Sequence, residues 1–193
     1  MRDEQDFGEG RRRPLRTILA VDDSRTNLNV LGQRLGQAGY LVILSDNGRE
    51  ALDLIAGCGI DLVLLDMMMP GVSGIDVLTE LRGGHPTVDL PVIMVTGRSE
   101  PSAAVEALAA GADDWIAKPF AFEVLLARIE RTLARAARLA ELKRANASLD
   151  ARIAARAIEL GETRADLASL NADRARLITS IQALHDEVER LSA

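Results

Sequence analysis

Short apolar runs alternate with amphipathic stretches along the first two thirds of the chain. Strands are predicted where the runs are continuous, at Thr17–Val21, Leu41–Ser45, Asp61–Asp66, Val92–Thr96 and Asp114–Ala117. Helices are predicted where apolar positions recur three or four residues apart, at Ser24–Ala38, Gly48–Ala56, Ser73–Arg82, Ser102–Ala109 and from Ala121 onward. Gly39 and Gly111 follow two of these helices, where terminal glycines are common. Strict alternation of strand and helix predicts a parallel sheet covered by helices on both faces.

The pattern changes after the fifth predicted strand. Residues 121–193 contain no proline and one glycine, Gly161, and apolar residues keep a 3,4 spacing from Leu139. Such spacing over many heptads predicts a long coiled coil rather than a single surface helix. The predicted dimer seam consists of Leu139, Leu142, Asn146, Leu149, Ile153, Leu160, Leu167, Leu170, Leu177, Ile181, Leu184, Val188 and Leu191.

Polar residues interrupt this seam at a few positions. Asn146 at an a position favours a parallel, two-stranded coil, because buried asparagines pair and fix the register. Arg156 and Thr163 flank Gly161 and predict a weak middle, and Arg174 makes a second weak layer. The sequence leaves open whether Gly161 interrupts the helix.

Composition and charge divide the chain into three parts. Residues 1–15 are charged and are expected to be a disordered leader, residues 16–135 a compact domain, and residues 136–193 the coil. Residues 1–120 carry 11 basic and 18 acidic side chains, a net charge of −7, whereas residues 121–193 carry 12 and 11. A tail with nearly balanced charge argues against direct nucleic-acid binding. A single cysteine and the lack of a long apolar run favour a cytoplasmic protein without membrane contact.

Polar side chains end four of the predicted strands. Asp22 and Asp23 follow the first strand, Asp66 ends the third, Thr96 ends the fourth, and Lys118 follows the fifth. The carboxyl ends of parallel strands meet at the crevice where open α/β sheets bind ligands. Two carboxylates about 5 Å apart repel by roughly 3 kcal/mol at an effective dielectric constant of about 20. The cluster therefore requires a cation or a proton, and hard oxygen ligands with room left for water suit Mg²⁺.

These residues lie within longer motifs that resemble one family. Residues 15 to 135 resemble the receiver domain of two-component response regulators through Val21-Asp22-Asp23-Ser24, Asp66-Met67-Met68-Met69-Pro70-Gly71, Gly111-Ala112-Asp113-Asp114-Trp115 and Lys118-Pro119-Phe120. The resemblance implies a flavodoxin-like, doubly wound (βα)5 receiver, and here its fifth helix would extend into a long parallel coiled coil.

The resemblance also implies a role for each site residue. Asp66 would be the phosphoacceptor, and Asp22, Asp23, Asp66 and the backbone carbonyl of Met68 would bind Mg²⁺. Lys118 would pair with Asp66 and then with the phosphoryl group, and the Lys118–Pro119 peptide is expected to be cis.

The same resemblance assigns a switch to two residues. Thr96 would donate its hydroxyl to the phosphoryl group, and Trp115 would move inward with it. Trp115 departs from the family in size, because that position usually holds tyrosine or phenylalanine.

The expected function is that of a two-component response regulator. A sensor histidine kinase or a phosphotransfer protein would phosphorylate Asp66, and the signal would pass on as a rearrangement of a coiled-coil homodimer. The chain itself is expected not to be an enzyme, beyond slow self-dephosphorylation. Two alternatives are the regulatory part of a diguanylate cyclase, suggested by the ending Val188–Ala193, and a stand-alone adaptor or phosphate sink. A kinase fragment is favoured only if His185 accepts phosphate.

Overall fold

The computed structural model describes residues 15–84, 86–97 and 101–192. Its elements follow in the order β1 (Thr17–Val21), α1 (Arg25–Gln37), β2 (Leu41–Ser45), α2 (Gly48–Gly57), β3 (Leu62–Asp66), α3 (Gly74–Gly83), β4 (Val92–Thr96), α4 (Pro101–Ala109), β5 (Asp114–Ala117) and α5 (Phe122–Ser192). The predicted strands and helices are confirmed, with ends that differ by at most one residue. One strand starts later than predicted, because the carboxylate of Asp61 instead accepts hydrogen bonds from Arg16 and the Thr17 backbone.

The strands form one parallel sheet in the order β2-β1-β3-β4-β5. After β1 the chain adds β2 on one side and then crosses to add β3 on the other. Such a reversal opens a crevice beyond the carboxyl ends of the two central strands. Val21 pairs with Leu65 in the β1–β3 register. Asp22 and Asp66 are the next residues of their chain segments, so both lie at this crevice.

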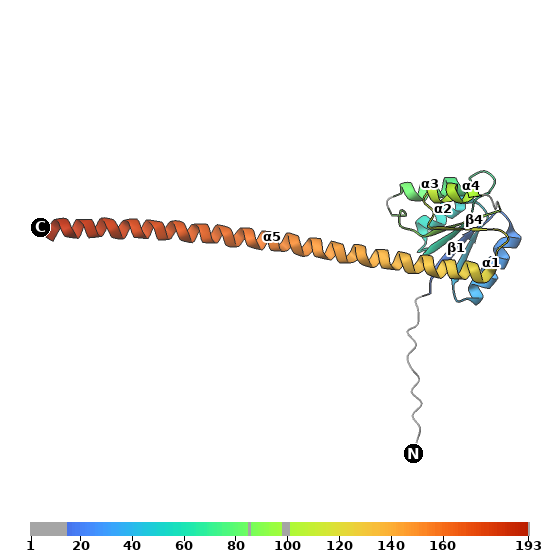
Figure 1. Cartoon of the computed structure of the whole chain (residues 1–193), viewed down its shortest axis with the longest axis horizontal. Coiled ribbons are helices and arrows are strands. Elements are labelled where there is room, and N and C mark those ends of the chain that lie inside the picture. Colours follow the sequence, from blue (N-terminus) through green and yellow to red (C-terminus); the bar gives the residue numbers. More distant parts are fainter. Residues whose placement is uncertain (1–14, 85, 98–100, 193) are drawn as a thin grey trace, which may run out of the picture. The chain divides into compact units, whose positions relative to one another are not determined.

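Two apolar layers enclose the sheet, as a doubly wound α/β fold requires. Helices α2, α3 and α4 cover one face, whereas α1 and the first turns of α5 cover the other (Figure 1). Neighbouring residues of a strand therefore pack into different layers. Leu64 packs into the layer with α1 and α5, and Leu65 packs into the layer with α2, α3 and α4. All residues of β3 and β4 are buried, which explains why their runs are apolar throughout.

Local signals in the sequence set the helix boundaries. The Ser24 side chain accepts a hydrogen bond from the Asn27 backbone at the start of α1, and Ser73 forms a capping box with Asp76 at the start of α3. Gly39 and Gly111 adopt φ angles of 91° and 96° after α1 and α4, a conformation that favours glycine. The two glycines therefore stand where the sequence predicted them.

The chain divides into two compact units between Leu139 and Ala140. In the first unit, α5 buries Leu125, Ile129 and Thr132. In the second unit, α5 continues through Gly161 without interruption, which answers the question that the sequence left open. None of the described helices combines the length and apolarity that a membrane span requires.

Every described side chain from Ala140 onward is exposed. The apolar residues of the predicted seam whose side chains are described are exposed too, from 47% at Leu139 to 68% at Leu170. The side chains of His185 and Leu191, and residues 1–14 of the predicted leader, lie outside the described residues.

Candidate functional site

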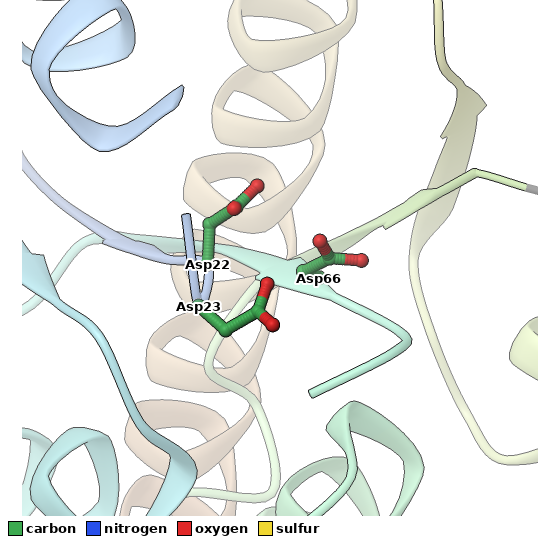
Figure 2. A group of neighbouring side chains, drawn as sticks. All are labelled: Asp22, Asp23 and Asp66. Carbon is green, nitrogen blue, oxygen red and sulfur yellow. The ribbon is translucent and has the colours of Figure 1, made fainter. Parts of the chain in front are cut away.

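Three carboxylates meet at the crevice beyond β1 and β3. One oxygen of each of Asp22, Asp23 and Asp66 lies within 4.8 Å of the others. Figure 2 shows their carboxylates at the ends of the two strands, with that of Asp23 directed towards Asp66. Asp22 and Asp66 are 2% and 6% exposed, whereas Asp23 is exposed. The cluster therefore has two buried members and one that solvent reaches.

The start of α1 fixes the position of Asp22. The Ser24 backbone N–H donates to Asp22 Oδ1 over 2.9 Å, and Asn27 Nδ2 donates to Oδ1 and Oδ2 over 3.1 and 3.3 Å. A carboxylate at a helix N-terminus is also favoured by the helix dipole. These donors determine the orientation of Asp22, whose Oδ2 also contacts the Lys118 ammonium.

Lys118 joins the two buried carboxylates. Its ammonium lies 2.6 Å from Asp22 Oδ2 and 2.7 Å from Asp66 Oδ2. The Lys118 backbone N–H donates to the carbonyl of Thr96 over 2.7 Å, which holds the end of β5 beside the end of β4. The Lys118–Pro119 peptide is cis, as predicted. One ammonium thus balances one of three carboxylates.

Burial and pairing shift the pKa values of two site residues. Burial is the largest influence on Asp66 and raises the pKa of its carboxyl above the ordinary value, although the hydrogen bonds from Lys118 and Met68 lower it. Burial by itself lowers the pKa of Lys118, but the hydrogen bonds and charges of Asp22 and Asp66 together raise that pKa above its ordinary value. Lys118 therefore keeps its proton, while Asp66 is a carboxylate that its surroundings only partly stabilise.

Thr96 and Trp115 lie on the two neighbouring strands at the same side of the site. Asp66 pairs in register with Val95, so Thr96 follows one position beyond it, and Thr96 is 1% exposed. Trp115 pairs with Met94 and packs, partly buried, against the layer formed with α2, α3 and α4. The structure thus brings both residues to adjacent strands, and their switch role stays a prediction.

The loop after β3 passes directly over the phosphoacceptor candidate. The Met68 backbone N–H donates to Asp66 Oδ1 over 3.2 Å, and the Met68 side chain is 54% exposed. Met67 and Met69 are instead buried in the core. The main chain of Met68 therefore lies beside the carboxylate, and the metal-binding role of its carbonyl stays a prediction.

Sequence reasoning missed two residues that shape the site. Asn27 orients Asp22 through a hydrogen bond from its side-chain amide. The sequence feature that could have indicated this role is an amide side chain in the first turn of the helix after the aspartates. Gly74 begins α3 so close to β3 that an added Cβ would overlap the backbone carbonyl of Asp66. No local pattern marked Gly74, because its neighbour is distant in sequence.

The donor set fits a small divalent cation. The possible ligands are carboxylate oxygens from the ends of two strands. Among the described residues, the Lys118 side chain forms ion pairs with two of these carboxylates. Asp23 is exposed, so water reaches the cluster. Mg²⁺ prefers oxygen ligands and retains several waters, and it is commonly bound by one or two carboxylates. The residues present therefore suit Mg²⁺ better than a soft metal.

Comparisons with known proteins agree with this geometry. The family model described as "Response regulator receiver domain" matches residues 18–130. The response regulator MprA of Mycolicibacterium vanbaalenii is 48% identical over 118 residues, covering 61% of this chain and 50% of that protein. MprA of Mycobacterium tuberculosis H37Rv is 46% identical over the same coverage. The chain thus spans about half the length of the curated relatives it matches.

Solved structures give the same result. The chemotaxis protein CheY4 of Vibrio cholerae is 32% identical, with a TM-score of 0.58 over 61% of this chain and 98% of that one. The response regulator TrrA of Thermotoga maritima, solved in complex with Mg²⁺ and BeF, is 32% identical, with a TM-score of 0.56 over 61% of this chain and 99% of that one.

Proposed function

This chain belongs to the family of response regulator receiver domains, and from that premise we propose that Asp66 accepts a phosphoryl group from a sensor histidine kinase or a phosphotransfer protein. The observation that carries the proposal is the position of Asp66. It is a buried carboxylate whose oxygen lies 2.7 Å from an ammonium and whose neighbours supply two further carboxylates. This arrangement combines a nucleophile with groups that offset phosphoryl charge.

The transfer step follows from these groups. One carboxylate oxygen of Asp66 attacks phosphorus, and the new O–P bond forms as the P–N bond to the donor histidine breaks. The nitrogen keeps the electron pair of that bond, and the product is an acyl phosphate. Lys118 then pairs with a phosphoryl oxygen instead of Asp66, and the Thr96 hydroxyl donates to another. When bound by Asp22, Asp23 and Asp66, Mg²⁺ supplies further positive charge beside the phosphoryl group.

We further propose that the signal leaves through α5. Thr96 ends β4, and Trp115 lies in β5, the strand that precedes α5. The Asp114 carboxylate next to Trp115 pairs with Arg128 of α5 over 2.6 Å. The exposed leucine seam supports a parallel coiled-coil homodimer, because an isolated helix with such a seam leaves large apolar surface in water. Phosphorylation would shift the population between two arrangements of this dimer.

We also propose where the chain acts and what it does not bind. The chain acts as a cytoplasmic phosphoacceptor, with no catalytic activity beyond slow self-dephosphorylation. It contacts neither membranes nor nucleic acid directly. Two alternatives are the regulatory part of a diguanylate cyclase and a stand-alone adaptor or phosphate sink. They differ from the proposed function in what receives the signal, whereas the chemistry at Asp66 is the same in all three.

Light scattering tests the central proposal. Molar mass and hydrodynamic radius are measured with and without Mg²⁺ plus beryllofluoride, which mimics the phosphoryl group, and the Asp66→Asn variant is the control. A dimer in both states, with a change of radius in the native chain only, would indicate a constitutive coil that rearranges. A monomer that dimerises only with the mimic would indicate signalling by assembly. If Asp66→Asn responds as the native chain does, the proposal is wrong.

A further inference from the structure

The two edges of the sheet differ in how they are protected. Edge strands are commonly blunted by charged residues, proline or bulges, which prevent them from pairing with another chain. At one edge, β5 begins with Asp114, which forms an ion pair with Arg128. At the other edge, β2 (Leu41–Ser45) contains no charged residue and no proline, and it pairs with β1 without interruption. Its Leu41 and Leu44 are 52% and 38% exposed. β2 therefore leaves an uncharged, partly apolar edge open.

The hydrogen bonds to β1 identify the main-chain groups of β2 that face away from the sheet. The Leu41 N–H donates to the carbonyl of Arg16, just before β1. In a parallel ladder every second residue of a strand bonds to the same neighbour, so Val42 and Leu44 turn their N–H and C=O groups outward. Among the described residues, the sheet has no strand beyond β2. These outward groups match the main chain of another extended strand.

Helix α1 passes beside this edge with two glycines on the same flank. A Cβ added at Gly32 would lie 3.3 Å from the Leu44 side chain, which places Gly32 next to β2. Gly36 lies one turn further along α1, and a Cβ added there would meet no described atom within 4 Å. Glycine is unfavourable inside a helix, and the packing of the described residues gives no reason for it at Gly36. The space beside Gly36 is thus open to a group from another molecule.

We propose that β2 pairs antiparallel with β2 of a second copy of this chain, with Ile43 of each copy opposite Ile43 of the other. In that register Val42 of each copy exchanges two main-chain hydrogen bonds with Leu44 of the other. The two five-stranded sheets then join into one. The arrangement is two-fold symmetric, so the same surface serves both copies.

The same register brings the two glycine flanks together. α1 runs in the opposite direction to β2, and one helical turn covers about the length of two strand residues, so Gly36 lies level with Val42. Val42 packs into the layer with α1, and Leu44 of the second copy would lie directly beside it on that face. This leucine would fill the space over Gly36. With Gly32 of each helix facing Gly36 of the other, the two α1 helices could approach to about 8 Å.

This fit favours a second copy over a strand of an unrelated protein. An unrelated strand could bond to Val42 and Leu44, but nothing in this chain would match its side chains to the space at Gly36. Here the leucine and the space both belong to this chain, and the axis that pairs the strands also brings them together. The contact is small, so the association should be weak. It uses the first unit only and depends neither on the chemistry at Asp66 nor on the leucine seam.

Disulfide cross-linking reads the register of this contact. In a background with Cys58→Ser, Ile43→Cys chains should form a covalent dimer, since opposite residues of a non-hydrogen-bonded pair have Cα atoms about 4.5 Å apart. The matched control is Leu41→Cys, on the same face of the same strand and more exposed than Ile43. In the proposed register the two Leu41 positions lie about 13 Å apart along the strands, so this variant should not cross-link. Circular dichroism checks that both variants fold.

The two variants together decide the direction of pairing. Cross-linking of Ile43→Cys without Leu41→Cys supports the proposal. Equal cross-linking of both indicates a parallel pair or random collision, and cross-linking of neither indicates that no second copy binds this edge. Either of these results overturns the proposal. Leu149→Cys reports the leucine seam separately, so the strand pairing and the coil can each fail alone.

Sedimentation equilibrium at increasing chain concentration tests the fit at α1. Gly36→Gln fills the open space, and α1 stays stable because glutamine suits a helix better than glycine. It should weaken the docking step at least about 10-fold, since the second copy's leucine loses its place. The matched control is Gly83→Gln on α3, where an added Cβ also meets no described atom within 4 Å, and docking should be unchanged. Docking of Gly36→Gln as tight as that of the native chain would contradict the proposed register.

Discussion

The ammonium of Lys118 lies 2.7 Å from Asp66 Oδ2, although 52 positions separate the two residues in sequence. The same ammonium lies 2.6 Å from Asp22 Oδ2. A single cation thus holds together two carboxylates from different strands, both almost fully buried. Stability and chemistry at this site are therefore coupled, and substitutions here should change both.

Replacing Lys118 with methionine removes this shared cation. Lys118→Met should lower the free energy of unfolding by about 1–2 kcal/mol in metal-free buffer, less than for a fully buried pair because solvent reaches the side chain. Urea denaturation measures the loss. The matched control is Arg49→Met, an exposed cation on α2, which should change stability by less than about 0.5 kcal/mol. Equal effects of the two substitutions would contradict the coupling.

Replacing Asp66 with asparagine should have the opposite effect. Because burial raises the pKa of Asp66, ionisation costs the folded state free energy. That cost is absent below the unfolded pKa of 3.8 and is complete above the raised pKa of the folded state. Without divalent cations, Asp66→Asn should therefore gain stability relative to the native chain as the pH rises from 3.5 to neutrality, by about 1.4 kcal/mol per unit of pKa difference. An advantage that shrinks with rising pH would refute this assignment.

Divalent cations should stabilise the native chain through the carboxylate cluster. A cation that binds only the folded state adds about 2.7 kcal/mol at 100 times its dissociation constant. Asp23→Asn removes the exposed ligand and should reduce this gain, while the apo protein unfolds much as before. The exposed Asp53 of α2 provides a control, Asp53→Asn, that keeps the full gain. Isothermal titration with MgCl₂ and denaturation at fixed Mg²⁺ both measure the effect.

Two glycine substitutions should differ in sign. At Gly74 a Cβ would overlap the carbonyl of Asp66, so Gly74→Ala should destabilise the first unit by about 3 kcal/mol or more and weaken Mg²⁺ binding. At Gly36, within α1, the space is open, so Gly36→Ala should stabilise by up to about 1 kcal/mol through helix propensity. Thermal unfolding compares them, and a tolerated Gly74→Ala would mean that α3 shifts freely away from β3.

Trp115 is the single tryptophan and should report on the proposed switch. Its emission should change when Mg²⁺ and beryllofluoride are added to the native chain, because the ring is only partly buried and the strand beside it ends at Thr96. Thr96→Val keeps the shape of the side chain but removes the hydroxyl, and it should reduce this change severalfold. Asp66→Asn provides the baseline. An identical response in Thr96→Val would remove Thr96 from the switch.

The sequence by itself determined the order of the elements, their boundaries and the ends of the strands that carry chemistry. Asp66 could be placed at a crevice because an apolar run ends there, and buried parallel strands must be apolar on both faces. Gly39 and Gly111 could be assigned because a positive φ favours glycine locally. These features depend on residues that are adjacent in the sequence, so they can be predicted from the sequence alone.

Only the tertiary structure decided which distant groups share a space. Lys118 bridges Asp22 and Asp66, and Gly74 packs against the carbonyl of Asp66, because the β2-β1-β3-β4-β5 order brings separate loops to one crevice. The raised pKa of Asp66 likewise comes from burial by residues across the fold. Gly161 shows the same limit for a helix, since glycine propensity alone permits either a break or continuity. Such outcomes depend on packing in three dimensions, which local periodicity does not encode.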